Sequence, residues 1–102
     1  MVRHVILWKI DKAASDPDEI KKNAKENLEA LVGKIDGLLS LEVVTECLPS
    51  SSADMMLDST FESAEALEYY RTHPLHVKAA DTYVRPFAEV RLSFDTEEKN
   101  NA

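Results

Sequence analysis

The opening run from Val2 to Ile10 most constrains the fold of this chain, because both of its alternating sets of residues are largely apolar. Ile6 and Trp8 belong to one set, and Val5 and Leu7 belong to the other. A strand with one solvated face alternates apolar with polar residues, whereas a strand covered on both faces does not. The pattern therefore predicts a central strand in a sheet that is covered on both sides.

The segments that follow change between helical and strand periodicity. Asp16, Pro17 and Glu19 supply a helix start, and apolar residues at helical spacing continue to Ile35, with Gly33 as the predicted stop. Further strands are predicted at Leu38–Leu48, Ala53–Phe61 and Phe87–Phe94. Helical segments are predicted at Ala64–Arg71, with Ser63 as its cap, and at Leu75–Tyr83.

The resulting order, β-α-β-β-α-β, predicts an α+β fold of the ferredoxin-like kind, an antiparallel sheet with its helices on one face. The chain of 102 residues has room for one domain, expected at 1–95, and the polar stretch 96–102 is expected to be a disordered tail. The sheet face without helices is expected to pack against a second copy of the chain, which predicts a homodimer.

Composition excludes several partners. Acidic residues outnumber basic residues by 19 to 12, the net charge is −7, and the basic residues are scattered along the chain. Nucleic acids and anionic membrane surfaces would repel such a chain. No segment approaches the roughly 20 apolar residues that span a membrane, and the opening run lacks a cleavage site, so we expect a soluble cytoplasmic protein.

Cys47 is the single cysteine, so the chain forms no internal disulfide. We expect it on the same strand face as Leu39, Leu41 and Val43. With no histidine beside it in the sequence, a buried and inert thiol is the favoured interpretation.

The segment YYRTHPLHV, residues 69–77, concentrates the side chains that could do chemistry. Tyr70 follows Leu67 by three residues and so lies on the inward side of its helix, and Pro74 turns the chain so that His76 can fold back over that helix. An imidazole can take a proton near neutral pH, and a phenol can orient it or donate to a developing oxyanion. The pair predicts proton transfer without a cofactor.

Structural roles are the alternative for the same residues. His73 could cap the carbonyl groups at the helix end, and His76 could be a partly buried histidine satisfied by the backbone. A metal site on His73, His76 and Asp81 has weaker support, because Pro74 interrupts the spacing. We predict no metal ligand, although the loop around Gly33, residues 32–37, could offer carbonyls to a hard cation.

His4 is the third histidine and lies in the apolar opening strand, where an imidazole needs a hydrogen-bond partner or a wet cavity. If it shares a cavity with Tyr70 and His76, that cavity gains a third polar group, as small-molecule pockets usually have. Trp8 falls on the same strand face and is a further candidate for the lining.

Taken together, four stretches resemble the stress-responsive A/B barrel domain (Dabb) family: VRHVILWKI, IDGLLSLEV, STFESAEALEYYRTHPLHV and VRPFAEVRLSFD. The combination of the RH start with the HPxHV segment is the most specific part. The resemblance implies a dimeric α+β barrel in which two ferredoxin-like sheets meet face to face.

The resemblance also implies site residues, because the family includes polyketide cyclases of the olivetolic acid cyclase type. It assigns His76 as the catalytic base and Tyr70 as the orienting donor, with His4 beside them. Leu28 and Met55 stand where those cyclases carry a tyrosine and a further histidine in the pocket.

We therefore expect a homodimer with a hydrophobic cavity in each subunit that takes a small apolar or phenolic molecule and needs no cofactor. His4, Trp8, Leu28, Met55 and His73 are the predicted ligand-binding residues. The activity would be that of a cofactor-independent cyclase or lyase. The alternatives are a non-enzymatic stress-related stability or interaction protein and, by fold analogy, a cofactor-independent monooxygenase.

Overall fold

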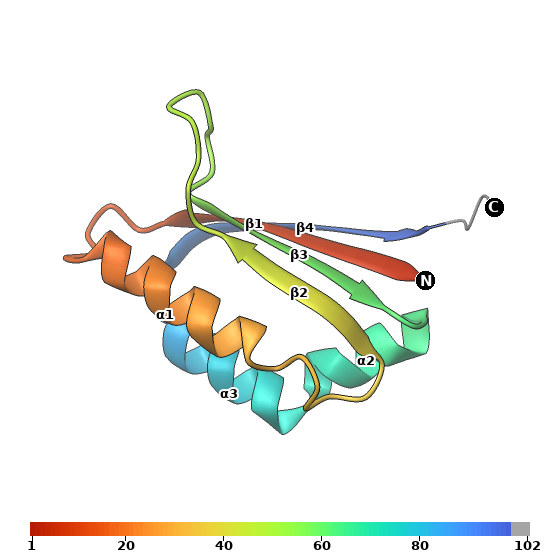
Figure 1. Cartoon of the computed structure of the whole chain (residues 1–102). Helices are drawn as coiled ribbons and strands as arrows, with labels where there is room; N and C mark the ends of the chain where they lie inside the picture. The colour runs from red at the N-terminus through yellow and green to blue at the C-terminus, as the bar shows by residue number, and fades with distance from the viewer. Residues whose placement is uncertain (99–102) are drawn as a thin grey trace.

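The computed structural model describes residues 1–98, which form a four-stranded antiparallel sheet with its helices on one face (Figure 1). The elements are β1 (Val2–Ile10), α1 (Pro17–Glu29), β2 (Leu38–Val44), β3 (Met55–Phe61), α2 (Ala64–Thr72), α3 (Pro74–Tyr83), the 3-10 turn η1 (Arg85–Phe87) and β4 (Ala88–Glu97). The strand order is β2-β3-β1-β4. The predicted ferredoxin-like α+β class is confirmed.

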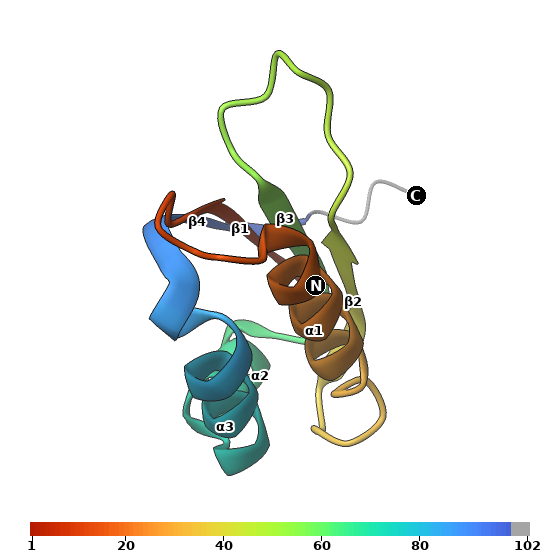
Figure 2. The ribbon, with the colours of Figure 1, turned by 90° about the vertical axis from the view of Figure 1, so that its left-hand side faces the viewer.

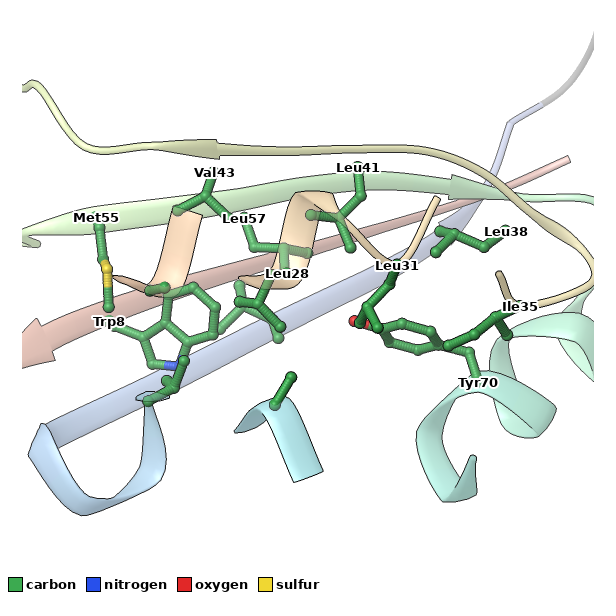
Figure 3. Packing of buried hydrophobic residues seen from close by; sticks show 14 of the residues in the cluster. Trp8, Leu28, Leu31, Ile35, Leu38, Leu41, Val43, Met55, Leu57 and Tyr70 are labelled. Carbon is green, nitrogen blue, oxygen red and sulfur yellow. The ribbon is translucent and has the colours of Figure 1, made fainter. Parts of the chain in front are cut away.

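β1 is a central strand, as predicted, and pairs antiparallel with β3 and with β4. Its residues Val2, Ile6, Trp8 and Ile10 are buried beneath the helices. Figure 3 shows the core around Trp8, in which side chains from the sheet meet those of α1 and of the segment after it. None of the helices in residues 1–98 is both long and apolar enough to cross a bilayer.

The opposite side of the sheet carries no helix, and Figure 2 shows all three helices on one side only. We call this side the open face. On β1 and β4, its apolar residues are Val5, Leu7, Val90, Leu92 and Phe94. Leu92 and Phe94 of β4 are 63% and 69% exposed, and Leu7 of β1 is 38% exposed. The second apolar set of β1 therefore lies on a surface that a single chain leaves uncovered.

α1 begins as predicted, with the Asp16 carboxylate accepting a hydrogen bond from the Glu19 N–H at 3.1 Å and Pro17 in the first turn. The helix ends at Glu29, earlier than the predicted stop at Gly33. Residues 30–35 instead form tight turns, closed by i→i+3 hydrogen bonds such as that from the Lys34 N–H to the Leu31 carbonyl. Gly33 does adopt a left-handed conformation, with φ of +87°.

β2 stops at Val44, four residues before the predicted end at Leu48. Since β3 begins only at Met55, residues 45–54 form a loop that projects beyond the open face (Figures 1 and 2), and at its end the Asp54 N–H donates to the Trp8 carbonyl at 2.9 Å. Cys47 lies in this loop and is exposed, so the prediction of a buried thiol is wrong. Leu39 is also exposed, because a register shift between Leu38 and Ser40 turns it away from the core.

The corner after β3 follows the predicted order with longer helices. The Ser63 hydroxyl accepts a hydrogen bond from the Ala66 N–H at 3.1 Å and starts α2, which ends at Thr72. His73 is extended, as expected of a residue before proline, and α3 begins directly at Pro74.

β4 continues three residues past the predicted end at Phe94. Asp95, Thr96 and Glu97 pair with His4, Arg3 and Val2, because β1 offers hydrogen-bonding partners up to its first residues. The start of the predicted tail is therefore strand. Its last residues, 99–102, lie outside the described part of the chain.

The exposed edge of β2 is closed by two side chains of α1. The Glu29 carboxylate accepts from the Val43 N–H at 2.9 Å and from Lys25 Nζ at 2.8 Å, and Lys25 Nζ also donates to the Val43 carbonyl at 2.8 Å. Burial acts to raise the pKa of Glu29, but the hydrogen bonds from Lys25 and Val43 outweigh it and the pKa is lowered. The pair replaces a neighbouring strand at Val43 and protects the edge.

Replacing Glu29 with alanine should therefore lower the free energy of unfolding by about 1–2 kcal/mol, because it leaves the Val43 N–H without its partner. Urea denaturation followed by circular dichroism measures the change. Glu26→Ala, an exposed position on the same helix, is the control and should change stability by less than about 0.5 kcal/mol. Equal effects of the two substitutions would contradict the role of Glu29.

Candidate functional site

Tyr70 is held in place by the packing of α2 on the sheet. The residue is 1% exposed, and its ring lies 5.0 Å from the ring of Phe61, centroid to centroid. Within residues 1–98 its hydroxyl makes no side-chain hydrogen bond. Burial raises the pKa of this phenol well above its usual value, and the charge of Arg91 offsets only part of the effect. Tyr70 is therefore a neutral hydrogen-bond donor at physiological pH.

His76 lies in the first turn of α3 and stacks on Tyr70, with ring centroids 4.1 Å apart and planes inclined by 33°. Its Nδ1 is 3.1 Å from the backbone carbonyl oxygen of Arg71. A carbonyl can only accept, so Nδ1 must carry the proton, and Nε2 of the neutral ring retains its lone pair. The fold thus selects the tautomer in which Nε2 can act as a base.

The charge state of His76 suits the same role. Burial lowers the pKa of the imidazole below its ordinary value of 6.5, and the hydrogen bond to the Arg71 carbonyl counteracts this only in part. The nearby charges of Arg85, His4 and Arg91 lower the pKa further. His76 is consequently uncharged near neutral pH, as a general base must be.

His4 is 4% exposed and finds the partner that its burial requires. Its Nδ1 contacts the Asp95 carboxylate, and its ring meets Phe61 edge to face at 6.2 Å. Sequence reasoning missed Asp95 because the strand was expected to end one residue earlier. Continuing the alternation of the last strand by one more residue would have revealed Asp95 as a candidate.

These three side chains line one pocket with a volume of about 280 Å³. The predicted convergence of His4, Tyr70 and His76 is therefore observed, but the wall around them is polar. Glu68 and Thr72 belong to the same wall, and the aliphatic contribution comes from Ile6. The expected hydrophobic cavity is not what surrounds His76.

The pocket also contains three arginines that sequence reasoning did not select. Arg71 follows Tyr70 directly, Arg85 lies in η1, and Arg91 lies in β4. The sequence offered one indication of them: the chain has only four arginines, and three of these lie after Tyr70, in the part of the chain that carries His76.

Trp8, Leu28 and Met55 belong to the hydrophobic core and not to this pocket (Figure 3). Trp8 pairs with Met55 across the β1–β3 ladder. It shares a face with His4, as predicted, but four residues of strand separate them by about 13 Å. One face of β1 therefore contributes Trp8 to the core at one end and His4 to the pocket at the other.

His73 has a structural role and lies outside the pocket. Its Nδ1 accepts a hydrogen bond from the Leu75 N–H at 3.1 Å and caps the start of α3. The imidazole therefore does not cap the carbonyls of α2, and only the backbone N–H of His73 donates to the Tyr70 carbonyl, at 3.1 Å. Its ring packs edge to face on Tyr69 at 5.4 Å.

The alternative metal sites find no support in the geometry. Asp81 binds Arg85, and no group of three or more histidine, cysteine, aspartate or glutamate side chains in residues 1–98 could hold a metal ion. In the loop of residues 32–37, the carbonyls of Ile35 and Gly37 already accept hydrogen bonds from the N–H groups of Leu38 and Glu62.

A second, larger cavity of about 340 Å³ lies between the start of α1 and the end of α3. Ile20, Tyr83 and Phe87 give it a more apolar wall. Its acidic residues are the N-cap Asp16 and the first-turn Glu19 of α1, and its lining holds no histidine. We therefore place the candidate site at His76.

Comparison with solved structures supports the fold. A dimeric protein of ferredoxin-like fold from Bacteroides fragilis is 28% identical, with 95% of each chain covered and a TM-score of 0.88. A protein from Arabidopsis thaliana is 23% identical, with 100% of this chain and 99% of that chain covered and a TM-score of 0.81. A hydroxynitrile lyase from Passiflora edulis is 17% identical, with 97% and 95% covered and a TM-score of 0.73. No curated protein sequence matches.

The sequence profile described as the stress responsive A/B barrel domain, Dabb, matches residues 2–98. This range includes every strand and helix described above. The chain therefore belongs to the stress responsive A/B barrel domain (Dabb) family.

Proposed function

We propose that the pocket of His4, Tyr70 and His76 binds a small organic molecule and that His76 removes a proton from it. The observation that carries the proposal is the pairing of a base with a donor at one pocket: Nε2 of His76 keeps its lone pair, and the buried Tyr70 stays protonated. A carbon acid such as a β-dicarbonyl or polyketide-like compound, or a phenol, fits this chemistry.

The proposed step needs no cofactor. Nε2 of His76 takes the proton from the carbon between two carbonyl groups, and the electron pair of the C–H bond moves into an enolate. The Tyr70 hydroxyl donates a hydrogen bond to the oxygen that gains the negative charge. His76 then returns the proton, or the enolate attacks a second carbonyl of the same molecule, as in a cyclase.

The resemblance to polyketide cyclases of the olivetolic acid cyclase type assigns the same pair, and one structural neighbour is described as a lyase. The pocket supports a phenolic or dicarbonyl ligand better than a purely apolar one, because its wall is mostly polar. These points favour the enzymatic proposal over a non-enzymatic stability or interaction protein.

We also propose that the chain forms a homodimer through its open face. Exposed apolar side chains gather there, including Leu92 and Phe94, and a neighbour 28% identical to this chain is described as dimeric. A monomer would leave this contiguous apolar surface in water, which soluble proteins usually avoid. Packing two such faces together would complete an α+β barrel.

Proton removal by His76 can be tested without the natural substrate. With ethyl acetoacetate in D2O as the probe, the protein should accelerate deuterium exchange at C2, measured by proton NMR. His76→Gln should reduce the protein-dependent rate by about 100-fold or more, and Tyr70→Phe by about 10- to 100-fold.

Matched controls are available in the same segment. Tyr69→Phe changes a half-exposed tyrosine on the same helix, and His73→Asn preserves a cap for α3, so both should retain the exchange rate within about twofold. If His76→Gln exchanges the probe as fast as the unmodified protein, His76 is not the base, and a non-enzymatic role becomes the better interpretation.

The pKa of His76 should lie below 6.5, because burial and neighbouring cations disfavour the imidazolium. The base is therefore present above this pKa and is lost as the pH falls through it, so the exchange rate should rise with pH and level off near neutrality. An NMR titration of the ring protons measures the value. Arg91→Gln should raise it, and Lys22→Gln on the exposed side of α1 should leave it unchanged. A pKa above 6.5 would contradict the assignment.

Leu92→Glu should convert the dimer to a monomer, because it places a charge in the centre of the proposed apolar interface. Sedimentation velocity at several concentrations measures the mass. Leu75→Glu, at a similarly apolar and exposed position on α3, is the control and should stay dimeric. A monomer for the unmodified protein would refute this mode of assembly.

A further inference from the structure

The pocket at His76 also indicates the charge of the molecule that it takes. We propose that it binds a small organic carboxylate, with Arg91 as the residue that receives the carboxylate group. This inference rests on the proposed function, because it assigns a class of ligand to the same pocket.

The distribution of charge is the first observation. The chain has a net charge of −7 and only four arginines, yet three of the four line this one pocket together with two of the three histidines. In an acidic protein, most of the surface repels an anion, so an anion is attracted mainly to a local group of cations. In this chain the pocket at His76 carries that group.

The pairing of these charges is the second observation. Each acidic side chain that contacts a polar residue of this wall already has a partner: Glu68 binds Arg71 at 3.3 Å, Asp81 binds Arg85, and Asp95 contacts His4. Arg91 makes no ion pair and no side-chain hydrogen bond within residues 1–98. Among residues 1–98, nothing therefore competes with a ligand for the hydrogen-bond donors of the Arg91 guanidinium.

Arg91 is exposed to solvent, and its place in the sheet puts it on the side where the pocket lies. It lies opposite Trp8 in the β1–β4 ladder and so belongs to the helix-facing side of the sheet. At the equivalent inward positions β3 has Met55, Leu57, Ser59 and Phe61, of which only Ser59 is polar, whereas β4 has Arg91, Ser93, Asp95 and Glu97. The inner side of β4 therefore provides a polar wall for the pocket and adds little to the core.

Arg91 lines the same pocket as both reacting groups, Tyr70 and His76. Its positive charge also acts to lower the pKa of each of them, against the effect of burial at Tyr70 and in the same direction as burial at His76. An anion held by Arg91 would therefore share the pocket with the base and the donor. The same cation would stabilise the enolate that forms when His76 removes a proton.

The chemistry of the site favours an organic carboxylate over a bare inorganic anion. The planar guanidinium fork matches a carboxylate with two parallel hydrogen bonds, although it also accepts phosphate. The ring of His76, which is partly exposed and stacks on the buried Tyr70, adds an aromatic surface that an organic group can cover and phosphate cannot. A volume of about 280 Å³ leaves room for such a group.

The test compares two phenols of the same shape that differ in charge, 4-hydroxybenzoate and 4-hydroxybenzamide. Each is titrated into the full-length protein, with the NMR signals of the His76 and Tyr70 rings as the readout of binding in the pocket. The carboxylate should bind about 10-fold or more tightly than the amide, because it can form a hydrogen-bonded ion pair with Arg91 and the neutral amide cannot. Its affinity should fall with added salt, and that of the amide should not.

Arg91→Gln should remove most of the difference by weakening the carboxylate about 10-fold while leaving the amide within about twofold. Arg91→Lys keeps the charge and should retain part of the preference. Lys22→Gln removes one positive charge outside the pocket and should leave both affinities unchanged. Since Arg91 makes no ion pair within the described residues, these variants should fold, which a thermal melt verifies.

The outcomes distinguish this inference from the proposed function. Equal binding of the two phenols at His76, or a preference that Arg91→Gln does not change, overturns the carboxylate assignment and leaves proton removal by His76 intact. Inorganic phosphate that binds as tightly as 4-hydroxybenzoate would overturn the preference for an organic anion. If the unmodified protein does not accelerate deuterium exchange of the neutral ethyl acetoacetate, or if His76→Gln does not slow that exchange, the proposed function itself is overturned.

Discussion

The hydrogen bonding of β1 to a strand on each side is the constraint on which the rest of the structure depends. A strand held in this way presents alternate side chains to two different surfaces. Ile6 and Trp8 enter the core under the helices, whereas Val5 and Leu7 lie on the open face. A single chain can cover only the first surface, because its helices all lie on that side. The fold therefore provides one complete core and one face suited to a partner.

The candidate site lies where the core gives way to polar residues. Toward the start of β1 the inward position is His4 instead of an aliphatic residue, and β4 contributes Asp95 directly opposite it. Arg91, two inward positions further along β4, lines the same pocket. Tyr70 and His76 close this region from the helix side, and the extended His73 between their helices lets α3 turn back over α2. The partial burial that makes the ring of His76 hard to protonate is thus a consequence of how the two helices meet at Pro74.

Features that depend on a few neighbouring residues were predicted well. The Asp16 and Ser63 caps, the break at Pro74 and the inward position of Tyr70 all follow from local backbone chemistry, and the structure confirms them. Predictions that depended on strand pairing were less accurate. Leu39 is exposed because of a register shift against β3, and Cys47 is exposed because its loop has no partner strand. Neither fact is encoded near the residue concerned.

The sequence alone determined the order of elements and the candidates His4, Tyr70 and His76, because periodicity, capping and the HPxHV segment are local properties of the chain. Only the tertiary structure decided which side chains meet. It placed Trp8, Leu28 and Met55 in the core, brought Asp95 to His4, and brought Arg85 and Arg91 to the pocket of His76. The physical reason is that these contacts join residues far apart in the chain, and the register of β4 on β1 sets which of them are neighbours.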